Sequence, residues 1–421
     1  MKGLLNNYGV WMVAALIILL VPIPFGSGFA LSIASQMTIA IVFALAYNML
    51  LGQGGMLSFG HAIFFGLAGY FTIHYLNWMG QGVVSYFPVS LLPLLGGLVS
   101  MVLGVLIGLV STRRAGTTFA MISLGFGEMV TALTLIIVSF FNGEEGIQGD
   151  RWVGPEPLGI TFGSDVQVYY LAGAWCFAAA VAMYAITRTP FGRMCNAVRD
   201  NPERAQFVGY NTQRVRWLAF TLSAFFSGIA GTLHALVFEH VGFETVDIAR
   251  SGFVLFMVYI GGTGTFLGPV LGAVLITWLT SILSNFTEAW YLYFGIIFVT
   301  IVMYAPGGLA GLIFMHEPIW LTDPRLLRRL LWPYALGLAS VLVALVGIIG
   351  EMEMIYHLSN DITGEFVMNL YGFDISLRNT VPWVICAIIG AIGLALCRKS
   401  FPLVAQHWHQ VMHEARERVL Q

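Results

Sequence analysis

The sequence predicts an all-α membrane protein, a polytopic bundle of about ten to twelve spans with some broken or re-entrant helices. Of its 421 residues 58% are hydrophobic and only 10% are charged, and the mean hydropathy is +0.83. A soluble domain carries roughly 25% charged residues, so a soluble chain this apolar could not cover its own core. The apolar residues also form runs, at 8–25, 29–51 and 91–110. Each run has about the 20 residues that span a hydrocarbon layer about 30 Å thick.

The first run begins directly after Lys2 and continues to Pro22 and Pro24. A secretory signal begins in the same way, but it ends at a cleavage site with a small-x-small pattern. Only residues 26–28 resemble such a site. We therefore interpret this run as a first membrane helix that is not removed.

Hydropathy then predicts a series of crossings along the chain. Their centres are Leu16, Ile41, Phe65, Leu103, Leu133, Ala178, Phe226, Phe256, Ile276, Phe298, Val341 and Ile388. The segment 57–78 is rich in glycine, which suits a re-entrant segment as well as a span. The segment 251–283 contains five glycines and a proline between residues 261 and 272, which predicts two helices that meet at a tight break.

The loop charges predict the orientation, because Lys and Arg gather in cytoplasmic loops. With Lys2 inside, every second loop should be basic. The basic residues that fit this rule are Arg113, Arg114, Arg188, Arg193, Arg199, Arg204, Arg214, Arg216, Arg325, Arg328, Arg329, Arg398 and Lys399. The alternate loops contain the acidic residues Glu144, Glu145, Asp150, Glu156, Glu239, Glu244, Asp247, Glu351, Glu353, Asp361 and Glu365. Both termini are therefore predicted to be cytoplasmic.

The basic loop at residues 188–217 contains a well-marked short helix. Asn201 is a good N-cap, and Pro202 suits the first helical position because no N–H is needed there. Glu203 lies in the first turn, where the helix dipole favours a negative charge. Gly209 supplies a natural end.

A helix of about two turns is not stable alone in water, so this one must dock against something. Ala205 is small enough to allow a close approach, and Phe207 and Val208 offer apolar contacts. One interpretation is that the helix lies on its own membrane surface. The other is that it inserts into a separate soluble subunit.

The residues of this helix resemble those of a known family. The spacing of Glu203, Ala205 and Gly209 is similar to the E-A-A-x-x-x-G loop of bacterial ABC importer permeases, which docks into a cleft of the ATPase subunit. Arg204 stands where that motif often has alanine, and Pro202 is inserted before the glutamate. The surrounding residues resemble the permeases for branched-chain amino acids, with matches at 187–193, 197–203 and 222–224.

Further stretches resemble the same family, at residues 50–70, 116–129, 142–149 and 261–273. The resemblance covers roughly residues 30–313. We therefore expect a permease core at residues 1–315. Residues 316–421 are expected to form a C-terminal extension with two further membrane helices.

The resemblance implies a permease subunit of a binding-protein-dependent ABC importer in the bacterial inner membrane, with a translocation path for branched-chain or related amino acids. Relatives that carry urea, amides or aromatic acids are the alternative within the family. The implied partners are a second permease subunit, two ATP-binding subunits, an extracytoplasmic binding protein and membrane lipid. The near-neutral net charge of −2 gives no reason to expect nucleic acid.

No enzyme site or cofactor is expected. The chain has no G-x-x-x-x-G-K-[ST] phosphate loop, so ATP hydrolysis should belong to the partner subunits. The four cysteines have no spacing typical of a metal site and are interpreted as packing thiols. A membrane-embedded lipid transferase would need a catalytic partner for the arginines of the basic loop. An ion-coupled secondary transporter would show inverted repeats and charges at mid-membrane, and no clear repeat is present.

Four residues are candidates for the translocation path: Gln53, Ser58, His61 and Glu128. Ionisable residues within spans are costly and often functional. Because its helix is otherwise apolar, we expect Glu128 to face the protein interior and to pair with a helix neighbour or with His61. A structural pair is favoured over a contact with the amino group of a passing substrate. The glycines of residues 52–60 predict close helix packing, and a broken helix that lines a polar path is the alternative.

Overall fold

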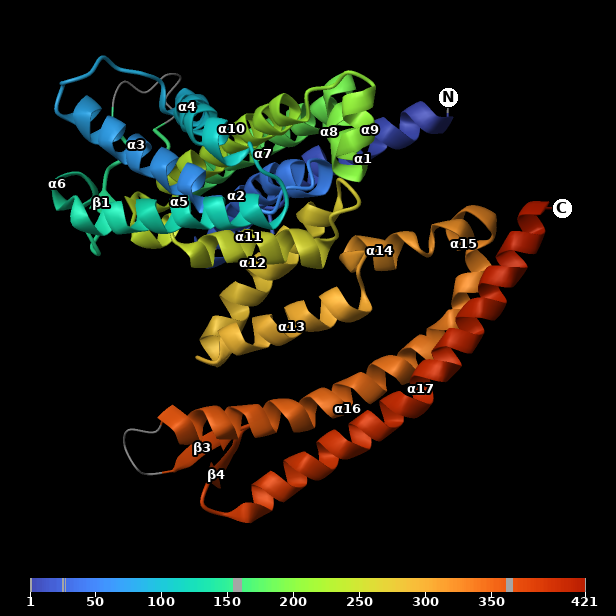
Figure 1. Cartoon of the computed structure of the whole chain (residues 1–421). Coiled ribbons are helices and arrows are strands. Elements are labelled where there is room, and N and C mark those ends of the chain that lie inside the picture. The colour runs from blue at the N-terminus through green and yellow to red at the C-terminus, as the bar shows by residue number, and fades with distance from the viewer. Residues whose placement is uncertain (1, 25, 27, 154–160, 361–365, 421) are drawn as a thin grey trace. The chain divides into compact units, whose positions relative to one another are not determined.

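The computed structural model describes residues 2–24, 26, 28–153, 161–360 and 366–420 (Figure 1). The predicted all-α class is confirmed, since helices make up nearly all of the regular structure. The described strands form two short antiparallel pairs. β1 (Ile147–Gln148) pairs with β2 (His240–Val241), and β3 (Val367–Leu370) pairs with β4 (Phe373–Ser376).

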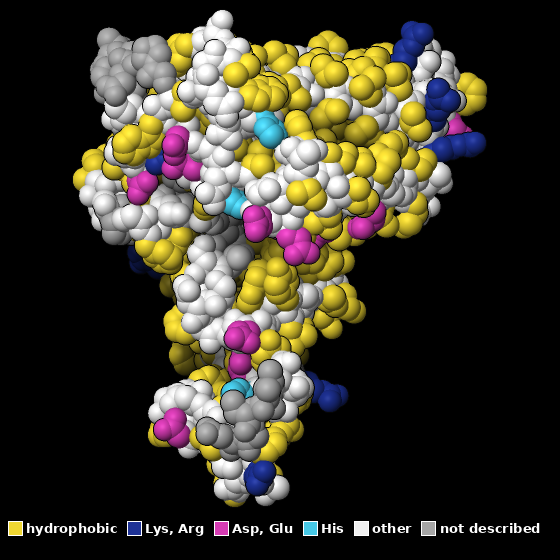
Figure 2. Space-filling view, turned by 90° about the vertical axis from the view of Figure 1, so that its left-hand side faces the viewer, with side chains coloured by type: hydrophobic (Ala, Val, Ile, Leu, Met, Phe, Trp, Pro, Cys, Tyr) yellow, Lys and Arg dark blue, Asp and Glu magenta, His cyan; other side chains and the backbone are white. Residues whose placement is uncertain are grey.

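A few sequence-based expectations fall on residues that are not described. The candidate cleavage segment 26–28 is described only in part, and Glu156, Asp361 and Glu365 of the acidic loops lie outside the described residues. On the face shown in Figure 2, hydrophobic side chains cover much of the surface, and the charged ones gather in a few patches. Such a surface fits a chain that is surrounded by lipid.

The chain divides into two compact units. Unit 1 comprises Met1–Phe286 and Gly295–Gly311, and unit 2 comprises Thr287–Phe294 and Leu312–Gln421. The helix α13 (Trp290–Tyr304) contributes residues to both units.

Unit 1 contains most of the helices. In chain order they are α1 (Lys2–Leu20), α2 (Gly28–Asn48), the π-helical turn η1 (Met49–Gln53), α3 (Ala62–Gly80), η2 (Val89–Leu91), α4 (Leu92–Ser111), α5 (Thr117–Ile136), α6 (Val138–Phe141), α7 (Asp165–Arg188), α8 (Pro190–Asp200), α9 (Pro202–Phe207), α10 (Thr212–Phe238), η4 (Phe243–Thr245), α11 (Ile248–Gly261) and α12 (Gly268–Phe286), and α14 (Gly308–Phe314) begins in this unit. Their ends follow local signals. Ser164 caps α7 by accepting from the backbone N–H of Gln167, and Asn211 caps α10 by accepting from the N–H of Arg214, as short polar side chains do at helix starts.

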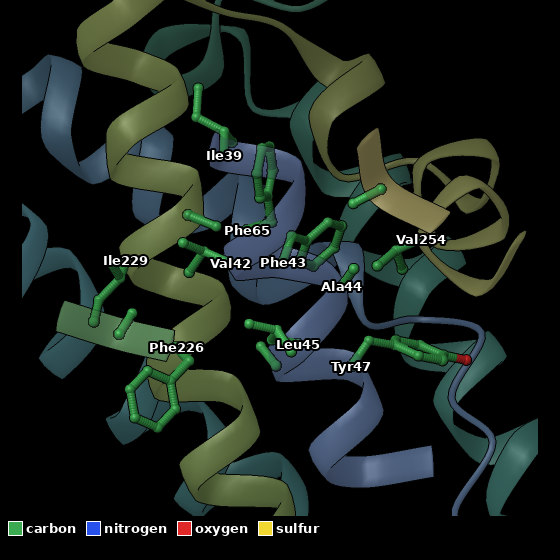
Figure 3. Packing of buried hydrophobic residues seen from close by; sticks show 14 of the residues in the cluster. Ile39, Val42, Phe43, Ala44, Leu45, Tyr47, Phe65, Phe226, Ile229 and Val254 are labelled. Carbon is green, nitrogen blue, oxygen red and sulfur yellow. The ribbon is translucent and has the colours of Figure 1, made fainter. Parts of the chain in front are cut away.

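The helix α10 forms the centre of unit 1. It packs against α2, α3 and α4, and it is buried around most of its circumference, which is typical of a core helix. Figure 3 shows the packing, in which Val42 and Phe43 of α2 lie among Phe65 of α3, Phe226 of α10 and Val254 of α11. These contacts fix the helices that surround the candidate site.

Every predicted crossing centre lies within a helix. Among the described residues, eight helices are long and apolar enough to cross a membrane, or nine if one bent pair is a single span. The difference from the ten to twelve predicted spans has physical causes. The helix α11 has only 14 residues, and α3 carries the polar His74 and Asn77 in its second half.

The predicted break between residues 251 and 283 is confirmed. α11 ends at Gly261 and α12 begins at Gly268, with Gly262 at a φ of +108° between them. A Cβ atom on Gly261 would overlap the carbonyl group of Gly268. The glycine-rich segment 57–78 is part irregular chain and part helix, because α3 begins only at Ala62.

Unit 2 is built on a helical hairpin. After α15 (Glu317–Thr322) and η5 (Pro324–Leu326), the long helices α16 (Leu327–Asn360) and α17 (Thr380–Leu420) run antiparallel, with the β3–β4 pair between them in the chain (Figure 1). Small residues let the two backbones approach closely. The backbone of Gly347 in α16 lies directly against that of Gly390 in α17.

We predict that Gly347→Ala destabilises this hairpin. The added Cβ would overlap backbone atoms of Gly390, which cannot move as a flexible side chain would, and overpacking of this kind costs about 1–3 kcal/mol. Gly337→Ala is the control, because its Cβ would lie an ordinary 3.4 Å from a methyl group of Val404. Detergent-solubilised protein should show a lower thermal midpoint for Gly347→Ala alone, and equal midpoints for the two variants would contradict this packing.

Candidate functional site

The short helix in the basic loop begins as its sequence predicts. It is α9, and the side-chain Oδ1 of Asn201 accepts a hydrogen bond of 2.9 Å from the backbone N–H of Arg204. Pro202 occupies the first helical position. The cap satisfies one of the N–H groups that a helix start leaves without a partner.

The end of α9 is also fixed by local chemistry. Tyr210 N–H donates to the carbonyl oxygen of Ala205 at 3.0 Å, and Gly209 N–H donates to that of Gln206 at 2.9 Å. This pair of bonds is a Schellman motif, which requires a left-handed residue at the position of Gly209. Gly209 has a φ of +94°, which suits a residue without a Cβ.

The two faces of α9 differ sharply in burial. Ala205 is buried in a hydrophobic cluster with Cys195 and Val198 of α8 and Val215 of α10. The expectation that Ala205 offers a close approach to a partner is therefore wrong, because it packs into its own chain. Phe207 and Val208 instead have 90% and 70% of their surface exposed.

The buried Cys195 is one of the predicted packing thiols. Burial raises the pKa of its thiol to about 12, so that the thiol stays protonated at neutral pH. The four cysteines are free, and no metal-binding group of His, Cys, Asp or Glu occurs among the described residues.

Gln53, Ser58 and His61 lie along the chain that leads from α2 to α3. α2 continues into the π-turn η1, which ends at Gln53, and the chain then has no regular secondary structure as far as His61. Gln53 is half-buried, whereas Ser58 and His61 are buried. The phenolic O–H of Tyr47 donates to the carbonyl oxygen of Ser58 at 2.8 Å.

His61 fastens this segment to α10. Its Nε2 lies 3.1 Å from Ser223 Oγ and 2.8 Å from Ser227 Oγ. The hydroxyl of Ser223 donates to the carbonyl oxygen of Ala46 at 2.6 Å, so its oxygen is left to accept from His61. This arrangement assigns the ring proton to Nε2. His61 thus holds residues 54–61 against α10 through buried hydrogen bonds.

Residues 54–61 also pack closely against α5. The backbone N–H of Phe59 donates to Ser123 Oγ at 3.1 Å. A Cβ on Gly60 would overlap the carbonyl oxygen of Ser123, and one on Gly127 would lie 3.2 Å from Gly60 Cα. Glu128 is the next residue of α5 after this contact.

Glu128 lies on the exposed face of α5. The prediction that it faces the interior and pairs with a helix neighbour or with His61 is wrong for this single chain. α5 turns its small and polar residues inward, at Ala120, Ser123, Gly127, Val130 and Thr134, and Glu128 stands beside that stripe with Met121, Met129 and Leu133. Within the described part of the chain, no side-chain hydrogen bond or ion pair involves Glu128.

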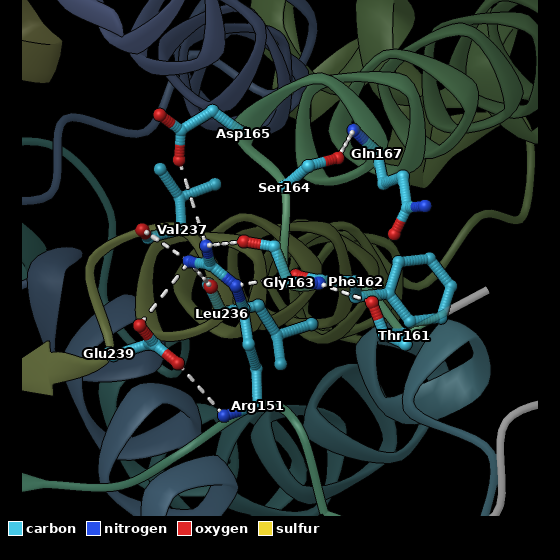
Figure 4. Close-up of polar contacts among 10 residues, drawn as sticks. All are labelled: Arg151, Thr161, Phe162, Gly163, Ser164, Asp165, Gln167, Leu236, Val237 and Glu239. Carbon is cyan, nitrogen blue, oxygen red and sulfur yellow. Dashed lines mark hydrogen bonds and ion pairs between the residues drawn. The ribbon is translucent and has the colours of Figure 1, made fainter.

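Arg151 was not singled out from the sequence, although it organises the opposite, acidic side of the unit. Its side chain is only 8% exposed. Its guanidinium donates to carbonyl oxygens of Leu236 and Val237 in α10 and of Phe162 and Gly163 before α7 (Figure 4). Ion pairs with Asp165 at 3.7 Å and Glu239 at 3.5 Å complete the site. One feature of the sequence could have indicated its role. Arg151 is a single arginine in an otherwise acidic loop, whereas Lys and Arg are expected in the cytoplasmic loops.

The part of the chain that contains all these residues also matches a known protein family. Residues 29–306 match the family model described as the permease component of the branched-chain amino acid transport system. The chain belongs to this family. It is thus a permease component of an ABC-type transporter, and a non-enzymatic role in transport is consistent with its relatives.

Curated relatives agree with this assignment. The high-affinity branched-chain amino acid transport system permease protein LivM of Salmonella typhimurium is 30% identical over 318 residues, which cover 70% of this chain and 73% of LivM. LivM of Escherichia coli is 29% identical over 318 residues, which again cover 70% of this chain and 73% of LivM. The autoinducer 2 import system permease protein LsrC of Klebsiella pneumoniae is 35% identical over 150 residues, covering 33% of this chain and 39% of LsrC. No solved structure matches the chain.

We predict that Gly60→Ala destabilises the permease at the contact between residues 54–61 and α5. The new Cβ would meet the carbonyl of Ser123, and the strain should cost about 1–3 kcal/mol of unfolding free energy. Gly125→Ala is the control, because a Cβ there meets nothing within 4 Å. Thermal unfolding of the isolated chain in detergent measures both variants. A stable Gly60→Ala variant would contradict the close contact.

Proposed function

We propose that this permease forms part of the translocation path for branched-chain or related amino acids in a binding-protein-dependent importer of the bacterial inner membrane. It would act with a second permease chain, two ATP-binding subunits and an extracytoplasmic binding protein. The family assignment supports the class of transporter. The two LivM relatives favour branched-chain amino acids over the autoinducer 2 named for LsrC, because they align with more of the chain.

The observation that carries this proposal is the construction of α9. A helix of six residues is not stable alone, yet both ends of α9 are capped and Ala205 anchors it in the core. Phe207 and Val208 remain exposed on this rigid support. Exposed apolar side chains on a pre-organised element are typical of a docking surface. We infer that these two residues contact the ATPase subunit on the cytoplasmic side, with both chain termini on that side.

The exposed face of α5 supports a second part of the proposal. Glu128 lies near the middle of a helix that is long and apolar enough to cross a membrane. A charged carboxylate that faced lipid at this depth would cost about 2.5–3.5 kcal/mol on insertion scales. Glu128 should therefore face the second permease chain or the path itself. Ser58 and His61 are buried, so they serve the path by holding residues 54–61 in place, and Gln53 lies at the end of η1.

The transport core is proposed to lie within residues 1–315. The family match ends at residue 306, and the α16–α17 hairpin of the extension at 316–421 packs mainly on itself. The extension is therefore proposed to be accessory to transport.

We predict that Phe207→Asp removes the binding of the ATPase subunits. The substitution places a charge in the middle of the proposed apolar contact without touching the core. Gln213→Asp is the matched control, because residue 213 is also exposed in the same loop and receives the same charge. Co-purification of tagged permease with its ATPase partners should fall at least about tenfold for Phe207→Asp only, as for loss of an interface hot spot. If the helix lay on its own membrane surface instead, both variants would bind the ATPase normally.

We predict that Glu128→Gln lowers uptake while the isolated permease keeps its stability. Because Glu128 is exposed in the single chain, the change should alter the unfolding free energy by no more than about 0.5 kcal/mol. Glu128→Asp keeps the charge and should retain more uptake than Glu128→Gln. Uptake into reconstituted vesicles and thermal unfolding are the two measurements. Normal uptake by Glu128→Gln would show that the charge has no part in transport.

A further inference from the structure

The break after α2 leaves a helix end that needs a partner. The turn η1 closes with hydrogen bonds from Gly55 N–H to the carbonyl of Leu51 at 3.0 Å and from Met56 N–H to the carbonyl of Leu50 at 3.1 Å. The last carbonyl groups of a helix have no partner within the helix. The carbonyl oxygen of Gly52 accepts a hydrogen bond from Nη1 of Arg199, which lies in α8, 147 residues further along the chain.

Arg199 fits this position through its stem as well as its charge. A Cβ on Gly55 would lie only 2.7 Å from Cγ of Arg199, so the aliphatic stem packs on the glycine backbone. Nε of Arg199 donates to Oδ1 of Asp200 at 2.9 Å. The planar guanidinium thus joins two groups at once, which a lysine ammonium on a flexible stem does less well. A cation at a helix C-terminus is also favoured by the helix dipole.

Only two residues separate Arg199 from the proposed docking helix. α8 ends at Asp200, α9 begins at Pro202, and only the N-cap Asn201 stands between them. Residues of α8, α9 and η1 share one hydrophobic cluster, which includes Leu50, Met56, Cys195, Val198 and Ala205. Close-packed groups of this kind transmit strain and do not deform freely.

The same break also contacts the turn between α11 and α12. A Cβ on Gly52 would lie 2.7 Å from the carbonyl oxygen of Thr263, in the turn between α11 and α12. Residues 54–61 then run to the contact of Gly60 with Ser123 and Gly127, beside Glu128. A movement of η1 would therefore reach both α5 and the α11–α12 break.

We propose that Arg199 is a positioning residue that couples the ATPase-docking helix α9 to the broken segment of residues 49–61. It contacts neither cargo nor ATP, and it acts by tying α8 to the Gly52 carbonyl. Among the described residues, this is the one hydrogen bond that joins α8 to residues 49–61. The inference rests on the proposed function, because it takes α9 as the ATPase contact.

The test uses the complete importer in vesicles, with Arg199→Gln, Arg199→Lys and the control Arg193→Gln. Arg193 is an exposed arginine on the same helix, so its removal changes the charge of α8 equally. Four quantities are measured: co-purification of the ATPase subunits, ATP hydrolysis, uptake of leucine and the thermal midpoint of the permease. Arg199→Gln should keep the bound ATPase and its hydrolysis but lower uptake per ATP hydrolysed about tenfold, the scale of one charged hydrogen bond. Arg199→Lys should recover only part of the loss, because it keeps the charge and not the planar guanidinium, and Arg193→Gln should behave as wild type.

Several results would overturn the proposal. They are unchanged uptake per ATP in Arg199→Gln, an equal loss in Arg193→Gln, or a thermal midpoint that falls in Arg199→Gln together with loss of the ATPase. The last result would make Arg199 a merely structural residue. Failure of the proposed function is seen separately, because the wild-type permease would then not retain the ATPase subunits, or Phe207→Asp would retain them.

Discussion

The arrangement of the helices depends on the need to satisfy the backbone where a membrane helix is interrupted. No water is available in the hydrocarbon layer, so a break survives only where protein groups replace the missing hydrogen bonds. Three polar backbone groups at the break after α2 find partners on three different elements. Arg199 of α8 binds the carbonyl of Gly52, Ser123 Oγ of α5 accepts from Phe59 N–H, and Ser251 Oγ of α11 accepts from Ala62 N–H. The break therefore ties together helices that are distant in sequence.

Two arginines at opposite ends of unit 1 both donate hydrogen bonds to carbonyl groups at the end of a helix. Arg151 donates to the last carbonyl groups of α10, and Arg199 donates to that of the π-turn after α2. Both positions are helix C-termini, where a cation is favoured by the dipole and by unpaired carbonyl groups. The two differ in surroundings. Arg151 has 8% of its side chain exposed and fastens a loop, whereas Arg199 has 39% exposed and stands beside the docking helix. The buried Arg151 suits a contact that stays unchanged. The more exposed Arg199 suits a contact that changes when a partner binds.

The parts of the fold that the sequence predicted are those that local chemistry decides. The caps at Asn201 and Gly209 require only a few neighbouring residues, and α9 begins and ends where they place it. The break between Gly261 and Gly268 is likewise encoded by glycines close in the chain. The number of spans was less predictable, since length and hydropathy decide it, and α11 is short while α3 contains polar residues. The role of Arg151 could not be predicted, because its partners come from two segments that are separate in the sequence, residues 162–165 and 236–239.

The direction in which a side chain faces was the hardest feature to predict, for a physical reason. In a membrane helix both the lipid-facing and the buried sides are apolar, so hydropathy does not separate them. In α5 the inward stripe consists of small residues such as Ser123 and Gly127, which pack on the backbone of Gly60. Glu128 is excluded from that stripe because no room for its side chain exists beside Gly60. In the assembly that we propose, its surroundings would depend on groups outside this chain, which the sequence of one subunit does not contain.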